Sequence, residues 1–419
     1  MNKRQPRTRA TFLFRLFFFG LLWAVQLPAQ TGFAQEQTAG AAPADLSLRD
    51  FRPRSTLIVP ETKLAHAAFP VIDLHTHFRL RMREATPEDL CKYVREVLAP
   101  NQVAICISLD AKLGEEDEHL NYLAGPLADR FGVFVHLDFQ GSGQAARPET
   151  WAVNQPSFAR EVAAKLQRAK ASGCLGVKFF KQFGLEHPDS QGRPLRINDR
   201  RFDPIWKACG ELGLPVLMHV ADPAAFFLPT DATNERWEEL ARHPEWSFAD
   251  SKFPRRERLA EDFLEVVARH RGTTFVAAHC LNYANDLGTL GKWLEAHSNL
   301  YVDIASRINE LGRQPYTARA FFDRFDQRIL FATDGPWPAE RLGYYWRFLE
   351  TFDENFPYSE KQPPPQGLWS IDGIGLRQES LRRIYFENAI RLMPALKEKY
   401  ERSSRKLHEQ ATKPPEKGA

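Results

Sequence analysis

Two histidines two residues apart, His75 and His77, are the side chains of this sequence whose type and spacing best suit a metal ion. They close the β-prone run VIDLHTH, residues 71–77. Side chains alternate across a strand, so both imidazoles would lie on the same face. Two imidazoles on one face can bind one divalent ion. The spacing alone leaves coincidence open, so further ligands have to be sought elsewhere in the chain.

Three more candidate ligands fall late in other β-prone runs. His219 lies near the end of LPVLMHV (214–220), His279 near the end of TTFVAAHC (273–280), and Asp334 ends RILFATD (328–334). If these runs are strands of one barrel, their late positions converge on one rim although they are far apart in sequence. The set therefore predicts a metal site. The alternative is a group of hydrogen-bonded core histidines and a helix-capping aspartate.

The elements that would position these residues alternate regularly along the chain. Amphipathic helical stretches such as 86–98, 156–173 and 257–270 separate eight β-prone runs, at 71–77, 102–110, 131–139, 174–180, 214–220, 273–280, 300–306 and 328–334. Strand and helix repeated eight times predict an α/β fold, a (β/α)₈ TIM barrel formed as one domain by residues 69–395. An open doubly wound sheet is the alternative. However, no GxGxxG or GxxxxGK[ST] motif follows the first run.

Two additions to the barrel are expected. The connection after the fifth strand, residues 221–252, is long and rich in aromatic residues, Trp237 and Trp246 among them. It would lie on the face that carries the active site of a barrel, so we expect a lid over the metal pocket; an aromatic cluster on the outside is the alternative. Residues 366–394 end in an amphipathic helix expected to pack on the barrel. Residues 396–419 are highly charged and predict a disordered tail.

The N-terminus has the pattern of an export signal. Residues 1–34 hold a basic stretch, the apolar run LFFFGLLWAVQL and then small residues, which predicts a signal peptide. Residues 35–68 show no sustained period and predict a flexible leader. We therefore expect an exported protein, periplasmic or secreted. An uncleaved segment that anchors the chain to a membrane is the alternative, although the apolar run is short for a span.

The charge balance argues against an electrostatic partner. The 419-residue chain has a formal net charge of +3, but residues 1–34 hold five of its 56 basic side chains and none of its 53 acidic ones. The remaining 51 basic and 53 acidic residues give a charge of −2. This near-neutral body indicates no nucleic-acid partner, and we expect a small-molecule substrate. Five scattered cysteines are given no chemistry, and nothing indicates the oligomeric state.

The same motifs, taken together, resemble a known family. VIDLHTH, LMHV, AAHC and FATDGPW occur here in that order, and LRRIYFENAIRLMP follows them. They resemble the amidohydrolase superfamily, specifically its amidohydrolase-related branch, from about Phe69 to Pro394. The stretch ADPAAFFLPTDATNERWEELARHPEWSF is similar to a subgroup of exported bacterial metal-dependent hydrolases of unassigned substrate. The resemblance is specific for fold and ligand set, and it does not specify the substrate.

This resemblance implies roles for the candidate residues. His75, His77, His219 and Asp334 would be ligands of a divalent metal, one or two ions, while His279 would be a ligand or a catalytic acid/base. Asp334 can contact both metal and water, which suits a catalytic proton acceptor. Zinc suits a histidine-rich site, and manganese or iron remain alternatives.

Three further residues are candidates around this set. Lys178 in GVKFFKQ corresponds to the lysine that, once carbamylated, bridges two metals in binuclear members of the superfamily. Alternatively, Lys178 binds a substrate carboxylate or forms an ion pair with Asp138 or Asp222. Lys181 would contact the substrate. Arg307 would hold a substrate carboxylate, with an ordinary salt bridge as the alternative.

The resemblance predicts hydrolysis of a C–N or C–O bond of an amide, lactone or ester by metal-activated water. The alternative is a mononuclear zinc decarboxylase, a lyase acting on an aromatic or unsaturated carboxylic acid. A barrel that only binds its ligand is a third class, which the complete ligand set argues against.

Overall fold

The computed structural model describes residues 46–47, 50–51, 53–123 and 127–412. The predicted signal peptide, residues 1–34, and the first part of the leader lie outside the described residues. The chain divides into Met1–Leu57 and Ile58–Ala419. The few described residues of the first unit form no helix or strand, and all helices and strands of the described residues lie in the second unit.

Eight strands form one sheet in the order in which they occur in the chain, and every neighbouring pair is parallel. The predicted barrel is therefore confirmed. The strands are shorter than most of the β-prone runs, which extend beyond them at one or both ends. Their bounds are β1 Val71–Thr76, β2 Val103–Lys112, β3 Phe131–His136, β4 Gly176–Phe179, β5 Val216–Met218, β6 Phe275–Ala277, β7 Leu300–Asp303 and β8 Ile329–Leu330.

The barrel closes between its last and first strands through the extended segment that follows β8. Leu74 N donates to Phe331 O at 3.0 Å, Asp334 N to His75 O at 2.8 Å, and His77 N to Gly335 O at 2.6 Å. This seam is the step that brings Asp334 beside the two histidines of β1. Residues more than 250 positions apart in the chain thus become backbone neighbours.

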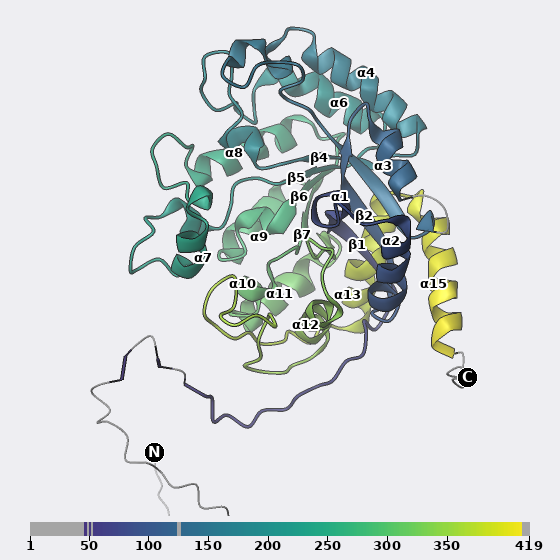
Figure 1. Cartoon of the computed structure of the whole chain (residues 1–419), viewed down its shortest axis with the longest axis vertical. Coiled ribbons are helices and arrows are strands. Elements are labelled where there is room, and N and C mark those ends of the chain that lie inside the picture. Colours follow the sequence, from purple (N-terminus) through teal and green to yellow (C-terminus); the bar gives the residue numbers. More distant parts are fainter. Residues whose placement is uncertain (1–45, 48–49, 52, 124–126, 413–419) are drawn as a thin grey trace, which may run out of the picture. The chain divides into compact units, whose positions relative to one another are not determined.

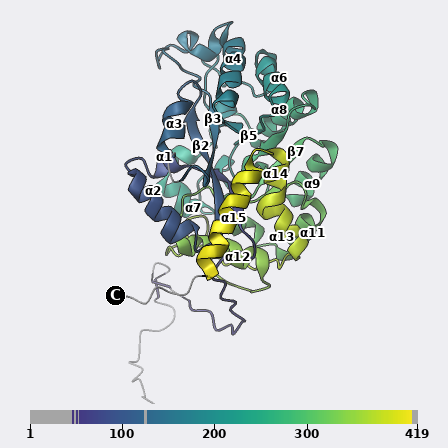
Figure 2. The same cartoon turned by 90° about the vertical axis from the view of Figure 1, so that its right-hand side faces the viewer.

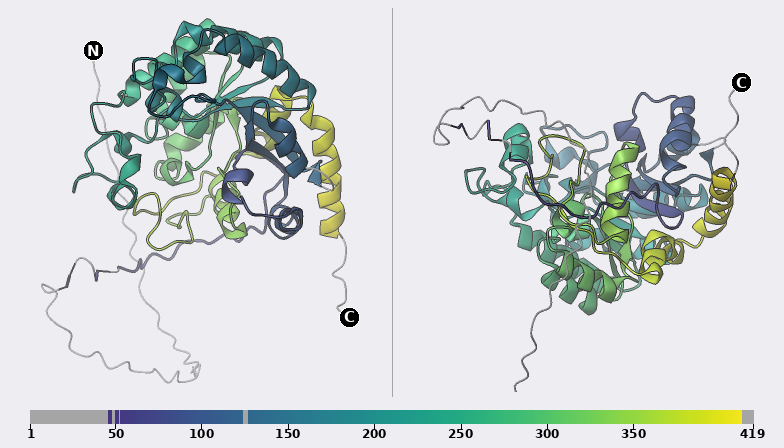
Figure 3. Two further views of the ribbon diagram at one scale, coloured as in Figure 1. Left: turned by 45° about the horizontal axis from the view of Figure 1, so that its top comes forward. Right: turned by 90° about the horizontal axis from the view of Figure 1, so that it is seen from below.

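Helices surround the strands (Figures 1 and 3). The main ones are α2 Pro87–Tyr93, α3 Glu116–Tyr122, α4 Phe158–Ala171, α6 Asp203–Glu211, α8 Arg256–Arg269, α9 Leu287–Ala296, α11 Pro315–Phe325 and α12 Ala339–Glu350. Shorter ones are α1 Phe78–Arg81, α5 Gln182–Leu185 and α10 Ile308–Leu311. In α4, Phe158, Val162, Leu166 and Ala169 are buried, three and four residues apart, which is the stripe expected of an amphipathic helix.

The insertion after β5 contains one α-helix, α7 Trp237–Arg242, and two 3₁₀ turns, Ala224–Phe227 and Pro244–Trp246.

Near the C-terminal end of the chain, α13 Gln378–Arg382 continues through a π turn into α14 Asn388–Leu392. That π turn packs against β1 and β8, which confirms the predicted C-terminal helix on the barrel.

The prediction of a disordered tail is wrong for residues 396–412. They form the helix α15, Leu396–Thr412, which lies beside α14 and β2 (Figure 2). Leu396, Tyr400, Ser403 and Leu407 form its buried stripe, and Leu396 joins the cluster that fills the barrel interior. Ser403 Oγ also donates to Asp129 O at 2.9 Å. The high charge of this segment obscured the stripe; residues 413–419 lie outside the described residues.

Shortening Leu396 should therefore destabilise the whole barrel. Leu396→Ala is expected to lower the free energy of unfolding by about 2–5 kcal/mol, because it leaves a cavity in the barrel interior. Urea denaturation followed by circular dichroism measures the change. Leu228→Ala, at an exposed leucine, is the control and should stay within about 0.5 kcal/mol of the parent. Equal stability of the two variants would show that α15 is not part of the cooperative fold.

The end of the leader packs on the barrel. Ala67 is buried, and Thr62 binds Asp353 through its backbone N and its hydroxyl, each at 2.7 Å. Flexibility of the preceding residues stays a prediction. Within the described part of the chain, no helix has the length and apolar character needed to cross a membrane.

Candidate functional site

The two histidines of β1 are held by carboxylates from neighbouring elements. His75 Nδ1 lies 2.9 Å from Asp303 Oδ2, and His77 Nδ1 lies 2.6 Å from Asp110 Oδ1. Each Nδ1–H therefore donates to a carboxylate, which leaves each Nε2 with a free lone pair. The two Nε2 atoms are only 3.2 Å apart. Two acceptor nitrogens at this distance repel each other unless a cation lies between them.

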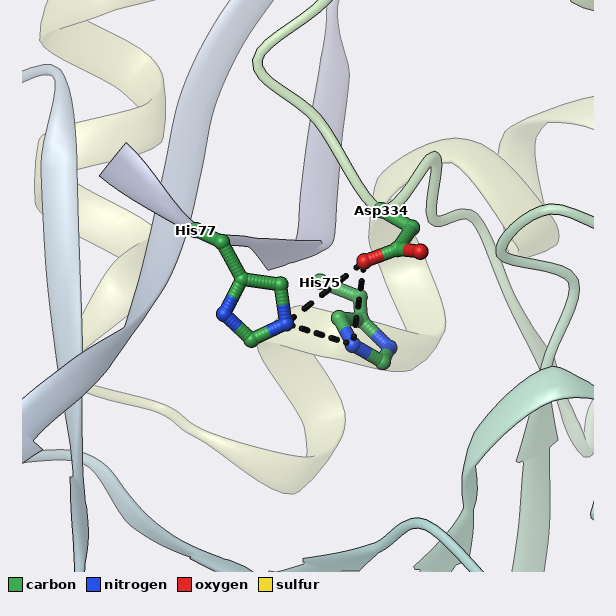
Figure 4. A group of neighbouring side chains, drawn as sticks. All are labelled: His75, His77 and Asp334. Atoms are coloured by element: carbon green, nitrogen blue, oxygen red, sulfur yellow. Dashed lines mark hydrogen bonds and ion pairs between the residues drawn. The ribbon is translucent and has the colours of Figure 1, made fainter. Parts of the chain in front are cut away.

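Asp334 completes a three-ligand group with these nitrogens (Figure 4). Its Oδ1 lies 3.8 Å from His75 Nε2 and 3.5 Å from His77 Nε2. Ligands about 2.0–2.1 Å from one ion are separated from one another by roughly 3–4 Å. The donor types and their separations therefore fit a divalent metal ion.

Asp334 is held in place from both its backbone and its side chain. Its φ of +65° is a left-handed conformation that aspartate and asparagine adopt more readily than most residues. Ser306 Oγ donates to its Oδ2 at 3.2 Å, and the guanidinium of Arg81 lies 3.5 Å from the same oxygen. The Asp334 side chain is 22% exposed, so it faces both the histidines and solvent.

His279 lies beside His75 from the end of β6. Their ring centroids are 4.8 Å apart, and the three residues His75, His279 and Asp303 form a second group with ligand geometry. His279 Nδ1 donates to Ala305 O at 2.8 Å, which leaves Nε2 available as ligand or base. Its φ of +57° begins a left-handed stretch over residues 279–282, which turns the chain away from the strand direction at this point.

His219 follows β5 directly, and one of its ring nitrogens lacks a hydrogen-bond partner. Its Nε2 is buried and has no hydrogen-bond partner in the described structure. The closest ion-pair contact given for that atom is with Asp222 Oδ1, at 3.5 Å. The rings of His219 and His279 are 4.4 Å apart. A buried imidazole nitrogen without a hydrogen-bond partner, set among other histidines, fits the role of a metal ligand.

Lys178 points into the same group from β4. Its Nζ lies 3.2 Å from His75 Nε2, and the side chain is buried. Among the described residues, no carboxylate comes within ion-pair distance of Nζ. The alternatives in which Lys178 forms an ion pair with Asp138 or Asp222 are therefore wrong, because Lys112 and Lys181 occupy those carboxylates instead.

Burial keeps the imidazoles of His75, His219 and His279 uncharged. Removal from water lowers the pKa of His75, His219 and His279 well below the usual histidine range; for His75 and His219 the charge of Lys178 is the second cause. Burial also lowers the pKa of Lys178 to about 8. The cluster thus presents lone pairs, which suits a bound cation.

The sequence reasoning missed Asp110 as a functional residue and gave Asp303 no role beside His75. Both are buried and lie at the ends of strands, Asp110 late in β2 and Asp303 at the end of β7. Asp303 also accepts from the backbone N of His279 at 2.7 Å, so one carboxylate orients two candidate ligands. The available signal was position: each is a carboxylate within a β-prone run, and Asp110 stands at the last position of its run, as Asp334 does.

Removing either carboxylate charge should weaken metal binding. Asp110→Asn and Asp303→Asn are each expected to raise the Kd for a divalent ion about 10–100-fold, because the histidine bound by that carboxylate loses its basicity and fixed orientation. A chelator-competition titration measures Kd. Asp117→Asn, an exposed change in α3, is the control. Unchanged affinity in both variants would remove the orienting role from these carboxylates.

The two residues predicted to contact substrate already have protein partners. Lys181 Nζ lies 2.5 Å from Asp222 Oδ2. Arg307 donates to Ser306 O at 2.6 Å and to Asn282 Oδ1 at 2.5 Å. Both line the same cavity as His219, His279 and Asp334, so substrate contact remains a prediction for each.

A cavity of about 440 Å³ opens onto His219, His279 and Asp334. Seven arginine or lysine side chains line it, against three carboxylates. The insertion after β5 forms one wall, which includes Phe226 and Trp246. Trp246 thus lies where a lid residue was expected, whereas Trp237 is 48% exposed and does not line the cavity. A second cavity, of about 450 Å³, is lined by Lys178, which does not line the first.

Comparison with solved structures finds barrels of similar fold. A 2,6-dihydroxybenzoate decarboxylase from Rhizobium is 15% identical, with 78% of this chain and 99% of that chain covered and a TM-score of 0.46. A dihydroxybenzoic acid decarboxylase from Polaromonas sp. JS666, with bound manganese and the inhibitor 2-nitroresorcinol, is 16% identical, covering 77% and 96%, with a TM-score of 0.46. The 5-carboxyvanillate decarboxylase of Sphingomonas paucimobilis is 11% identical, covering 78% and 99%, with a TM-score of 0.44.

No curated protein matches the chain. The family model described as amidohydrolase matches residues 142–394. This range contains Lys178, His219, His279 and Asp334, and it begins after the two histidines of β1, which the barrel seam brings to Asp334. The match covers more than half of the sequence, so this chain belongs to the amidohydrolase family and is a metal-dependent enzyme of that superfamily.

Proposed function

We propose that this enzyme hydrolyses a C–O or C–N bond of a small organic molecule with two divalent ions. The observation that carries the proposal is the position of Lys178, buried 3.2 Å from His75 Nε2 without a carboxylate partner among the described residues. A neutral amine there can attack CO₂, form an N–C bond and release a proton, which turns the lysine into a carbamate. The carbamate would add two oxygen ligands between His75 and the pair His219 and His279.

Different residues of the site would have different roles in this reaction, as metal ligands or as the proton acceptor. His75, His77 and Asp334 would hold one ion, and His219 and His279 would hold the second, with zinc as the proposed metal. Bound divalent ions lower the pKa of water toward neutrality and polarise the bond under attack. Asp334, with one oxygen on the histidines and the other toward the cavity, would accept the proton of the attacking water and pass it to the leaving group.

Metal counting and a substrate panel test this proposal. Elemental analysis of the purified protein should find two ions per chain, and Lys178→Met should reduce that number while the barrel stays folded. The panel consists of lactones, esters, amides and aromatic acids, with hydrolysis followed by proton release and decarboxylation by CO₂ release. One ion per chain in both proteins, or CO₂ release without hydrolysis, would refute two-metal hydrolysis.

Decarboxylation of an aromatic or unsaturated acid is the second candidate, and the cavity favours it. Its excess of positive side chains and its walls of Phe226, Trp246 and Trp337 suit a flat carboxylic acid. The family match is compatible with decarboxylation at least as well as with hydrolysis. The solved structures named above are decarboxylases, although a likeness of fold alone carries no activity. In this case one ion suffices, and Lys178 would remain an amine.

We also propose export, on the basis of residues 1–34 alone. Expression with a C-terminal tag followed by cell fractionation tests it. The tagged protein should appear outside the cytoplasm with residues 1–34 removed; recovery of the intact N-terminus from the cytosol would contradict export, and recovery from membranes would support the anchor.

A further inference from the structure

Arg341 in α12 is a buried cation without a carboxylate partner. It is 6% exposed and lines the same cavity as Asp334. The hydrogen bond that the structure gives its guanidinium is a long one, from Nη1 to Ser359 Oγ at 3.4 Å. Within the described residues, no acidic side chain lies within 4.0 Å of it.

The other buried arginines of the cavity behave differently. Arg236, 1% exposed, forms ion pairs with Glu239 at 2.7 Å and with Glu310 at 3.0 Å. Arg307 lies 3.6 Å from Glu310 as well. A charge removed from water without a counter-charge is costly, and proteins rarely keep one without a use. Among the buried arginines that line the cavity, Arg341 is therefore the one for which the described residues supply no carboxylate partner.

Trp337 connects Arg341 to the reactive end of the cavity. The Cζ atoms of Arg341 and Arg81 lie 4.4 Å and 4.2 Å from the centre of its ring. Its Nε1 donates to Thr333 O at 2.8 Å, which fixes the ring. Arg81 in turn lies 3.5 Å from Asp334 Oδ2. A cationic, aromatic surface thus runs from Asp334 to Arg341.

We propose that Arg341 binds a carboxylate of the substrate, with Arg81 as the second cation on Trp337. The substrate is then an organic acid whose apolar part lies along the aromatic wall that includes Phe226 and Trp246. The guanidinium fork offers two parallel N–H donors, which match the two oxygens of a carboxylate and its single charge. This inference rests on the proposed function only in taking the Asp334 end as the place of reaction.

Isothermal titration of the metal-loaded full chain with benzoate and with the neutral analogue benzamide tests the site. The parent should bind benzoate at least tenfold more tightly than benzamide. Arg341→Met should raise the Kd for benzoate at least tenfold and leave that for benzamide unchanged. Arg341→Lys should fall between the two, since it keeps the charge and loses the fork. Arg160→Gln, at an exposed arginine outside the cavity, is the matched control and should stay within twofold of the parent.

Thermal unfolding separates a binding role from a structural one. Arg341→Met should keep or raise Tm in the absence of ligand, because an unpaired buried charge is replaced by an apolar side chain of similar length. If Arg341→Met does not fold, Arg81→Gln is tested instead, because the Arg81 side chain is 36% exposed. Arg81→Gln is expected to raise the Kd for benzoate severalfold.

Three results would overturn the inference: equal affinity of the parent for benzoate and benzamide, parent-like benzoate binding in Arg341→Met, or a lowered Tm of that variant. Binding of inorganic phosphate in preference to benzoate would also overturn it, in favour of a phosphate site. Failure of the proposed hydrolysis is distinguishable from failure of this inference. It would change the metal count and the product analysis, whereas the difference between the Kd values for benzoate and benzamide would persist.

Discussion

Replacing Asp334 by asparagine is expected to lower kcat/KM by about 10²–10⁴-fold on the substrate that the panel identifies. The change removes the negative charge that faces His75 Nε2 and His77 Nε2 and the group that would accept the proton of the attacking water. The fold should persist, because asparagine has the same size and tolerates the φ of +65° at this position. Ser306 Oγ can still donate to the amide oxygen.

Initial rates, metal content and the circular dichroism spectrum of Asp334→Asn are to be measured together. The control is Asp250→Asn, the same chemical change at an exposed aspartate outside the cavity, which should retain parent activity. A variant that keeps more than about a tenth of the parent rate would lie outside the range for a lost acid–base group. Asp334 would then be neither proton acceptor nor an essential ligand.

The order of the strands and the position of the candidate ligands were predictable from the sequence for one physical reason. In a parallel barrel the residues at the ends of strands gather on one rim, whatever their distance along the chain. His219 and Asp334 could therefore be grouped from the ends of their β-prone runs alone. The structure adds the seam, where Asp334 N bonds to His75 O, and this contact between the two ends of the barrel has no local signature.

The unpredicted features depend on contacts between segments distant in sequence. Nothing in the sequence distinguishes Asp110 from other polar residues at the ends of strands. The structure places its Oδ1 2.6 Å from His77 Nδ1. Arg341 and Arg347 lie in the same helix. Arg347 pairs with Asp353, whereas Arg341 has no carboxylate partner among the described residues, and this difference is not visible in the sequence. In α15 the charged side chains outnumber the buried ones, so composition indicated disorder although the stripe from Leu396 to Leu407 packs on the barrel.

Adding a divalent ion to the metal-free protein is expected to raise its stability strongly, and His75→Asn should abolish the effect. A ligand that binds only the folded chain stabilises it by about 4 kcal/mol when present at a thousand times its Kd. His75 is the residue on which the cluster depends, because its imidazole contacts His77, Lys178 and Asp303. Its replacement removes a ligand and releases the lysine and the carboxylate that face it.

Differential scanning calorimetry with and without zinc measures this shift and needs no substrate. His297→Asn, at the C-terminal end of α9 and away from the cavity, should show the parent shift and serves as the control. Manganese in place of zinc compares the two candidate metals under the same conditions. A zinc-induced rise in Tm that survives in His75→Asn would mean that the ion binds elsewhere. The separations of 3.2, 3.5 and 3.8 Å between the His75, His77 and Asp334 donor atoms would then need a different cation, such as a protonated Lys178, to explain them.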